Sequence, residues 1–165
     1  MNAIATVEAA VDPAFVYVVY IQTTPQKVWD ALTTPETQRL FWFGQHTQSD
    51  WKVGSPHTHV GADGAPNFSG QVLESDPPHR LTFTFLNSDR YPVMHAEGPS
   101  RASYLIEDVT TPGDRALTRL TLTHDGFSKI GSRSREGVSG GWTRILSNLK
   151  TLLETGKPLP AIKAA

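Results

Sequence analysis

Histidines are the side chains of this sequence best suited to acid–base or metal chemistry. His57 and His59 are separated by one residue, so on a strand both imidazoles would point to the same face. Two imidazoles on one face are the beginning of a zinc site, but the spacing identifies no third ligand. His46, His95 and His124 could join them only through folding. We therefore expect no bound metal and regard the pair as polar residues of a sheet face.

His124 precedes Asp125 at the end of an alternating segment, and histidine titrates close to neutral pH. Such a pair could act as a general base, which a cyclase or a hydrolase would need. Neighbouring residues on a strand point to opposite faces, however, so Asp125 is poorly placed to orient His124. The sequence also has no cysteine and no serine elbow that could supply a nucleophile. We expect no catalytic residue, and an acid–base enzyme using His124 remains the alternative.

Large aromatic side chains are the third group of interest, because they offer flat surfaces on which an apolar ligand can lie. Many of them are packing residues, and the sequence does not say which ones border an empty space. The residues predicted to form a ligand pocket are Trp42, Phe43, Trp51, His57, Phe83, Phe85, Tyr104, His124, Phe127, Trp142 and Ile145.

A long helix near the C-terminus must position part of this set. Apolar residues recur at steps of three and four from Val138 through Trp142 and Ile145 to Leu152, which predicts an apolar stripe on one side of a helix of about five turns. Asn148 is expected on its solvent-exposed side. The pair Gly140 and Gly141 is expected to let the helix approach another backbone closely.

The N-terminal part predicts one strand and two short helices. Phe15–Ile21 is the longest apolar run and is expected to be a strand buried on both faces. Thr24 followed by Pro25 predicts the start of a helix, and Thr34 followed by Pro35 predicts a second helix ending near Phe41.

Alternating segments separated by polar turns predict an antiparallel sheet in the middle of the chain. The residues 87–100 are polar and contain glycine and proline, so we expect a loop there that could cover the mouth of a cavity. The expected strands are Trp51–Val53 and His57–Val60 as the arms of a hairpin, then Phe68–Glu74, Leu81–Phe85, Tyr104–Val109 and Ala116–Leu122.

Composition excludes several functional classes. The 165 residues include 15 basic and 16 acidic ones in no long block, so we expect no binding to nucleic acid or to a membrane. The longest apolar run is too short to span a bilayer, and the first residues lack the basic start of a signal peptide. Together with the absence of cysteine, this indicates a cytoplasmic protein. We expect no cofactor and either a monomer or a homodimer.

An ordered set of short motifs resembles a known family, the homologues of the C-terminal domain of the heat-shock protein 90 ATPase activator, within the START-related (SRPBCC) superfamily. The resemblance runs from about Phe15 to Gly156. The segments that carry it are Thr24–Glu36, Trp42–Phe43, Val53–Gly54, Gly70–Glu74, Asp76–Leu81, Leu120–Phe127 and Gly141–Gly156.

The resemblance implies an α+β helix-grip fold, also called START-like or Bet v 1-like. In it, a curved antiparallel sheet of about seven strands wraps around the long C-terminal helix, and two short helices follow the first strand. We expect one such domain at residues 15–156, with terminal extensions at 1–14 and 157–165. The family also implies a hydrophobic pocket between sheet and helix. Binding of a small hydrophobic or aromatic molecule is the expected function; a chaperone or protein-interaction module is an alternative beside the enzyme.

Overall fold

A computed structural model describes residues 12–161 of the chain. The remaining residues of the expected terminal extensions, 1–11 and 162–165, lie outside the described part. Within that part, no helix has the length and apolar character needed to cross a membrane. The elements in chain order are β1 (Phe15–Ile21), α1 (Pro25–Thr33), α2 (Pro35–Phe41), β2 (His46–Gln48), β3 (Pro56–Val60), β4 (Pro66–Asp76), β5 (Arg80–Asn87), α3 (Pro92–Ala96), β6 (Ser100–Asp108), β7 (Thr118–Asp125) and α4 (Arg133–Thr155).

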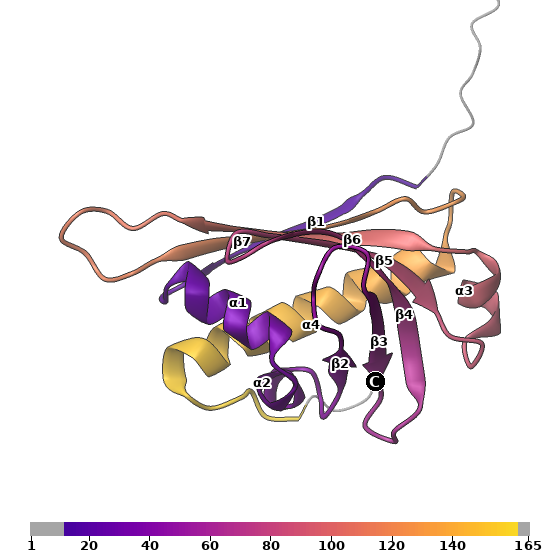
Figure 1. The fold of residues 1–165 in the computed structure, drawn as a ribbon, viewed down its shortest axis with the longest axis horizontal. Coiled ribbons are helices and arrows are strands. Elements are labelled where there is room, and N and C mark those ends of the chain that lie inside the picture. The colour runs from indigo at the N-terminus through magenta and orange to yellow at the C-terminus, as the bar shows by residue number, and fades with distance from the viewer. Residues whose placement is uncertain (1–11, 162–165) are drawn as a thin grey trace, which may run out of the picture.

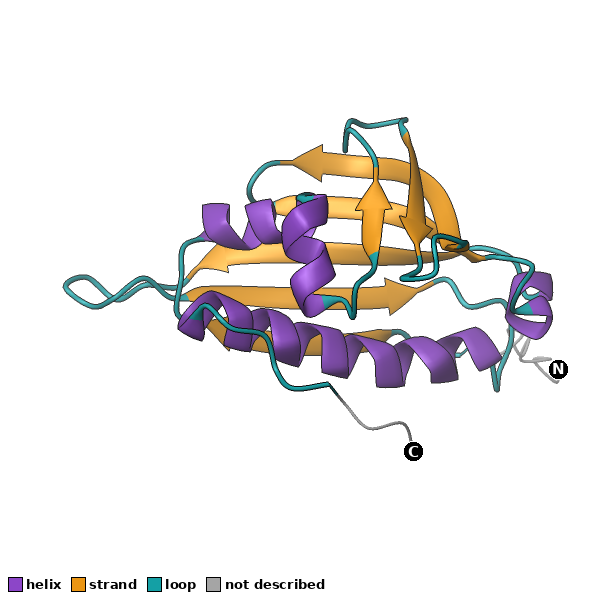
Figure 2. Ribbon diagram, turned by 90° about the horizontal axis from the view of Figure 1, so that it is seen from below, coloured by secondary structure: helices purple, strands orange, loops and turns teal. Residues whose placement is uncertain are grey.

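The strands form one seven-stranded antiparallel sheet in the order β1-β7-β6-β5-β4-β3-β2. From β2 to β7 each strand pairs with its neighbour in sequence, and β1 is added beside β7. The helix α4 runs below the sheet together with α1 and α2 (Figure 1). Seen from below, α4 runs along the direction of the strands at one side of the sheet (Figure 2). The predicted helix-grip fold is therefore confirmed.

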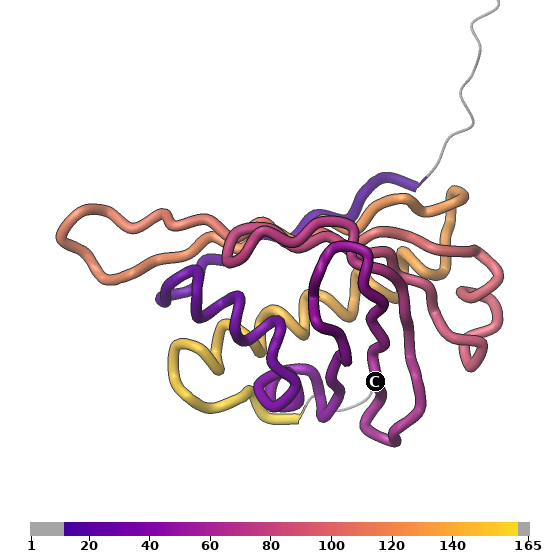
Figure 3. Tube along the Cα trace, in the orientation of Figure 1, coloured from indigo at the N-terminus to yellow at the C-terminus, as the bar shows by residue number. Residues whose placement is uncertain are grey.

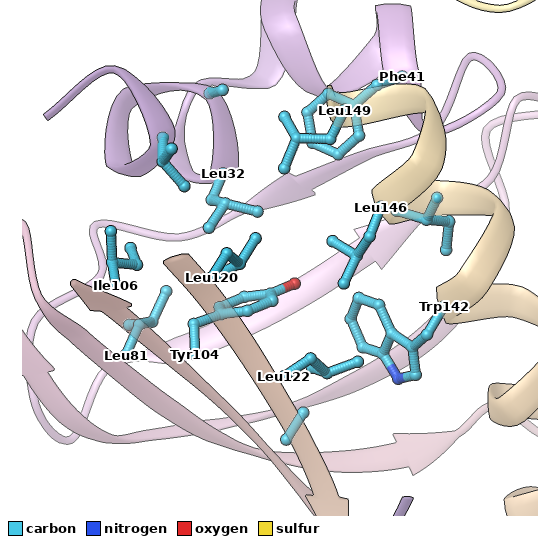
Figure 4. Packing of buried hydrophobic residues seen from close by; sticks show 14 of the residues in the cluster. Leu32, Phe41, Leu81, Tyr104, Ile106, Leu120, Leu122, Trp142, Leu146 and Leu149 are labelled. Carbon is cyan, nitrogen blue, oxygen red and sulfur yellow. The ribbon is translucent and has the colours of Figure 1, made fainter. Parts of the chain in front are cut away.

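The hydrophobic core lies between the sheet and these helices. On β7 burial alternates, so that Leu120 and Leu122 are fully buried while Thr121 and Thr123 face the other side. Figure 4 shows Leu120 and Leu122 pointing toward Leu146 and Trp142 of α4. The predicted apolar stripe of α4 is thus the face that packs on the sheet.

Short polar contacts fix the beginnings of the helices. The hydroxyl of Thr24 accepts a hydrogen bond from the amide of Lys27 at 3.4 Å, as the Thr-Pro signal predicted for α1. Asp12 lies beside the start of α4, where its carboxylate accepts hydrogen bonds from the amides of Gly131 and Ser132 at 2.9 and 2.6 Å. In Figure 3 the indigo start of β1 and the orange stretch before α4 lie at the same end of the molecule.

The prediction that β1 is buried on both faces was wrong. Val16, Val18 and Tyr20 are 55, 46 and 48% exposed, whereas Val19 and Ile21 are buried. The reason is that β1 forms one edge of the sheet and that α1, α2 and α4 lie on a single face (Figure 1). A run of apolar residues therefore does not by itself show that a strand is covered twice.

The predicted hairpin before β4 was partly wrong. β3 pairs with β2 rather than with Trp51–Val53, which contains no strand residue and leads into a turn at Val53 and Gly54. Trp51 has a positive φ of 58°, and the Asp50 carboxylate accepts a hydrogen bond from the amide of Lys52. Such a backbone cannot continue a strand. The expected loop at 87–100 contains the short helix α3, which starts at Pro92.

Two expectations about α4 were also wrong. A Cβ atom added to Gly140 or Gly141 would meet nothing within 4 Å, so these glycines serve no close backbone approach. Gly70, in contrast, does allow a close backbone approach, because a Cβ atom there would lie 2.0 Å from the carbonyl oxygen of Thr84 on the neighbouring strand. Asn148 is only 3% exposed rather than solvent-facing, because its amide donates to the carbonyl of Phe41 and accepts from the amide of Leu159.

Candidate functional site

An open groove of about 410 Å³ lies between the first half of α4, the strands β4 and β5 and the segment around α3. Its apolar lining comes from Trp42, Phe68, Phe85, Met94, Val138, Trp142 and Ile145. Its polar lining comes from Gln45, Asn67, Asn87, Tyr91, Ser134 and Arg144, and Gly137 and Gly141 complete the wall on α4. A mixed wall of this kind suits a small, mainly apolar molecule.

Stacked aromatic rings form the apolar wall. Phe68 and Phe85 stack with their ring centroids 3.9 Å apart, and Trp42 meets Trp142 edge to face at 5.3 Å. All four side chains are at most 8% exposed. Since aromatic rings adopt few rotamers and pack in fixed geometries, they give the groove a wall of defined shape.

The space itself results from small residues on α4. Gly137 and Gly141 are one turn apart and both face the groove. The nearest atom to a Cβ at Gly137 would be the sulfur of Met94 at 3.5 Å, and a Cβ at Gly141 would have no neighbour within 4 Å. A larger side chain at Gly141 would therefore project into open space.

Side-chain amides dominate the polar wall. Asn67 donates to the Oε1 atom of Gln45 at 2.8 Å, and the guanidinium of Arg90 donates to the Oδ1 atom of Asn67 at 3.1 Å. Arg144 is exposed and uses its Nε atom to donate to the carbonyl of Gly140 at 3.2 Å. The rim therefore offers neutral hydrogen-bonding groups and one cation.

Glu97 ties the segment after α3 to the start of α4. Its carboxylate accepts hydrogen bonds from the Ser132 hydroxyl and from the amides of Arg133 and Ser134, at 2.7, 2.9 and 3.0 Å. Desolvation alone would raise the pKa of Glu97, but these hydrogen bonds lower it to about 2. A negative charge at a helix N-terminus is also favoured by the helix dipole. Glu97 thus fixes one end of the groove.

His124 lies behind the groove wall and is fully buried. Trp142 donates its indole N–H to the Nδ1 atom of His124 at 3.0 Å, so the proton of the neutral ring is on Nε2, which donates to Ser100 at 2.7 Å. Burial lowers the pKa of His124 to about 4. Both nitrogens of this neutral imidazole are therefore occupied.

His57 and His59 do lie on one face of β3 and are both buried. His59 donates from Nε2 to Gln45 at 3.0 Å and accepts at Nδ1 from the hydroxyl of Thr47 at 2.9 Å, and burial lowers its pKa to about 3. His57 donates from Nε2 to the carbonyl of Thr84 at 2.7 Å. Among residues 12–161 no group of three metal-binding side chains is found.

A second, enclosed cavity of about 10 Å³ lies deeper in the interior. Its lining consists of Leu32, Gln38, Trp42, Thr47, Trp51, His57, Phe68, Phe83 and Tyr104. Trp42 and Phe68 line both spaces and thus separate the enclosed cavity from the groove. The volume is about that of one water molecule.

The predicted pocket residues are distributed over several places. Trp42, Phe85, Trp142 and Ile145 line the groove, whereas Trp51, His57, Phe83 and Tyr104 line the enclosed cavity together with Trp42. Phe127 is buried and stacks on His124 with the ring centroids 5.1 Å apart. Phe43 is 40% exposed with a positive φ of 53° and lines neither space.

Sequence reasoning missed the polar wall and the groove face of α4. Gly137 and Gly141 follow Ser134 by three and seven residues, so helical spacing could have placed all three on one face with Ile145 and with Val138, which the predicted apolar stripe already included. Phe68 could have been found from the alternation of its strand. Gln45, Asn67, Tyr91 and Met94 carry no such signal, because they lie near chain turns whose course only the fold defines.

Comparisons with known proteins agree with this architecture. A search among curated protein sequences found no match. Among solved structures, MLL2253 from Mesorhizobium loti is 23% identical with a TM-score of 0.69, covering 86% of this chain and 96% of that one. PFC0360w, an HSP90 activator from Plasmodium falciparum, is 20% identical with a TM-score of 0.66, covering 85% and 95%.

The Aha1 dimer from Colwellia psychrerythraea is 19% identical with a TM-score of 0.64, covering 88% of this chain and 99% of that one. These identities establish a common fold and nothing further. The profile of the family described as "Activator of Hsp90 ATPase homolog 1-like protein" matches residues 22–154, which include α1, the strands β2 to β7 and nearly all of α4. The chain therefore belongs to the family of activator of Hsp90 ATPase homolog 1-like proteins.

Proposed function

We propose that this protein binds a small hydrophobic or aromatic molecule in the groove beside α4, without catalysing a reaction. The observation that carries the proposal is a groove of about 410 Å³ whose aromatic wall is buried and stacked, next to glycines that leave its space open. Ligand sites in proteins usually have a volume of this order and a lining of this kind.

Binding energy would come mainly from removing apolar surface from water, at about 25 cal/mol per Å² less the cost of association. The amides of Gln45, Asn67 and Asn87 and the cation of Arg144 would orient a polar end of the ligand at the rim. Such groups contribute specificity rather than most of the affinity.

The acid–base enzyme finds less support. A general base must reach its substrate with a free nitrogen, and it works best with a pKa near the working pH. His124 is fully buried, has both ring nitrogens in hydrogen bonds, and has its pKa lowered to about 4 by burial. Its geometry supports a structural role behind the aromatic wall.

The test compares two substitutions one residue apart on α4. Gly141 lines the groove and Gly140 does not, and neither position has a neighbour within 4 Å of an added Cβ atom. We expect Gly141→Leu to weaken binding of the fluorescent probe 1-anilinonaphthalene-8-sulfonate at least tenfold, a change of about 1.4 kcal/mol. Gly140→Leu should bind it like the unsubstituted protein.

Equal binding by both variants would place the probe elsewhere, and no saturable binding of any apolar compound would refute a ligand site. The second outcome would favour the interaction module, because PFC0360w is described as an HSP90 activator. We also propose a cytoplasmic location and a monomeric or homodimeric state.

A further inference from the structure

We propose that the enclosed cavity beside His57 is the polar end of the ligand site, and that the ligand carries a hydroxyl group which occupies it. This inference rests on the proposed binding function and adds the chemical class of the ligand: an apolar or aromatic alcohol or phenol.

The Nδ1 atom of His57 is a buried polar atom without a hydrogen-bond partner in the described part of the chain. The whole residue is 1% exposed and lines the enclosed cavity. Buried polar atoms are nearly always paired, and leaving one unpaired costs about 1–3 kcal/mol. A hydrogen-bonding group in the cavity would therefore lie beside a residue that has one unpaired nitrogen.

Three other polar side chains of the lining already have hydrogen-bond partners within the protein. Gln38 donates to the carbonyl of Leu32 and accepts from the amide of Thr47. The Thr47 hydroxyl is hydrogen-bonded to His59, and the indole of Trp51 donates to the carbonyl of Thr33. None of these groups needs a ligand, so the unpaired nitrogen of His57 is the chemical feature that distinguishes the cavity.

The position of the proton on the His57 ring determines which ligand group can pair with its Nδ1 atom. The Nε2 atom of His57 faces the carbonyl oxygen of Thr84 at 2.7 Å, so Nε2 carries the proton and Nδ1 offers a lone pair. Desolvation lowers the pKa of His57, which keeps the ring neutral. A hydroxyl group can donate to this lone pair, whereas a carboxylate, a carbonyl or an ether oxygen has no proton to give.

Tyr104 offers a complementary group on the lining of the same cavity. The residue is 4% exposed, and burial raises the pKa of its phenol, so the hydroxyl remains neutral and able to donate or accept. A ligand hydroxyl that donates to His57 could therefore accept from Tyr104.

The enclosed cavity is adjacent to the groove. Trp42 and Phe68 line both spaces, so these two rings form part of the wall between an apolar body in the groove and the cavity beside His57. The ring centroids of Phe68 and His57 are 6.2 Å apart. A hydroxyl on the buried end of the ligand must displace part of this wall to reach the cavity.

Displacement of 1-anilinonaphthalene-8-sulfonate by 2-naphthol and by 2-methylnaphthalene tests the inference, because the two compounds differ by a hydroxyl in place of a methyl group. We expect 2-naphthol to bind about tenfold more tightly than its methyl counterpart. His57→Leu and Tyr104→Phe should each reduce this preference, and His57→Leu should abolish it. Phe83→Leu, which alters the same cavity without touching a polar group, should keep it.

A spectroscopic readout on the unsubstituted protein covers the case that His57→Leu does not fold. The ¹⁵N resonance of His57 Nδ1 should move on addition of 2-naphthol and stay in place with 2-methylnaphthalene. Equal affinities for the two compounds, or an Nδ1 resonance that does not move on addition of 2-naphthol, would overturn the inference. The groove would remain a ligand site, but the enclosed cavity would hold a water molecule only. If neither compound binds, the proposed function is wrong as well.

Discussion

The two halves of α4 cover interiors of different chemistry. The closed half, residues 146–155, packs aliphatic side chains such as Leu146, Leu149 and Leu152 against β1, α1 and α2, and each is at most 7% exposed. The open half, residues 133–145, presents glycines and lies over aromatic rings and the buried ring of His124. One helix therefore serves as a core element at one end and as a groove wall at the other.

This difference suggests a division of tasks. Aliphatic burial stabilises a fold at any pH, because it involves no titratable group. Neutral buried histidines add hydrogen-bonding atoms to an interior, but their burial makes stability depend on pH. We expect the open half to be less stable and more sensitive to acid than the closed half.

The largest predicted effect is loss of stability on mild acidification. Below pH 6.5 the unfolded chain takes up protons on His59 and His124, whereas burial holds their folded-state pKa values at about 3 and about 4. Lowering the pH from 7 to 5 therefore favours unfolding, by about 1.4 kcal/mol per histidine and pH unit below 6.5. Urea denaturation between pH 5 and 7 measures this loss.

The variant His124→Gln tests whether this histidine causes the loss of stability. It should reduce the slope of the unfolding free energy against pH by about 1.4 kcal/mol per pH unit in this window, which corresponds to one proton fewer taken up on unfolding. Glu97, whose pKa is lowered to about 2, titrates below the window and should not contribute. A free energy of unfolding that is flat from pH 7 to pH 5 would show that these histidines are hydrated in the folded protein.

The closed half is tested by Leu149→Ala. Leu149 is fully buried, so we expect a loss of about 3 kcal/mol in the free energy of unfolding from lost burial and a residual cavity. Val138→Ala in the open half is the control, because Val138 is partly buried and borders the groove; it should cost less than about 1 kcal/mol. Similar costs for both variants would contradict the division of α4 into two halves.

Glu97→Gln should cost about 2 kcal/mol at pH 7, because it removes a charge that accepts three hydrogen bonds at the start of α4. The folded protein favours the charged form of the carboxylate, because its hydrogen bonds lower the pKa. The contribution of Glu97 to stability is therefore fully present above about pH 4.5 and is lost as the pH falls through about 2. Denaturation of both proteins at pH 7 and pH 3 checks the sign: a difference that grows toward pH 3 would exclude a role for the charge.

The smallest predicted effect is a gain in stability. Gly140→Ala should stabilise the protein by up to about 1 kcal/mol, because glycine is unfavourable inside a helix and the new methyl group meets nothing within 4 Å. Gly141→Ala should stabilise by a similar amount. If the groove binds ligand as proposed, only the second variant should also weaken probe binding, which separates the two glycines by function.

Most of the fold could be predicted from the sequence because it follows from local periodicity. Alternation along residues 118–125 placed Leu120 and Leu122 in the core, and steps of three and four placed Trp142 and Leu149 on the inner face of α4. The Thr-Pro signals located both short helices. Each of these patterns depends only on residues close in sequence.

Tertiary structure alone decided what surrounds each residue. The sequence could not show that β1 is an edge strand, that the amide of Asn148 is hydrogen-bonded to Phe41 and Leu159, or that Phe43 lies outside the groove lining.

The same holds for the two spaces beside α4, because a cavity is the volume that segments distant in sequence leave unfilled. The groove lies where glycines of α4 face the rings of Trp42, Phe68 and Phe85, and the enclosed cavity lies beside His57, whose Nδ1 atom has no partner among the described residues. Periodicity determines which way a side chain points; only the packed fold determines whether anything meets it there.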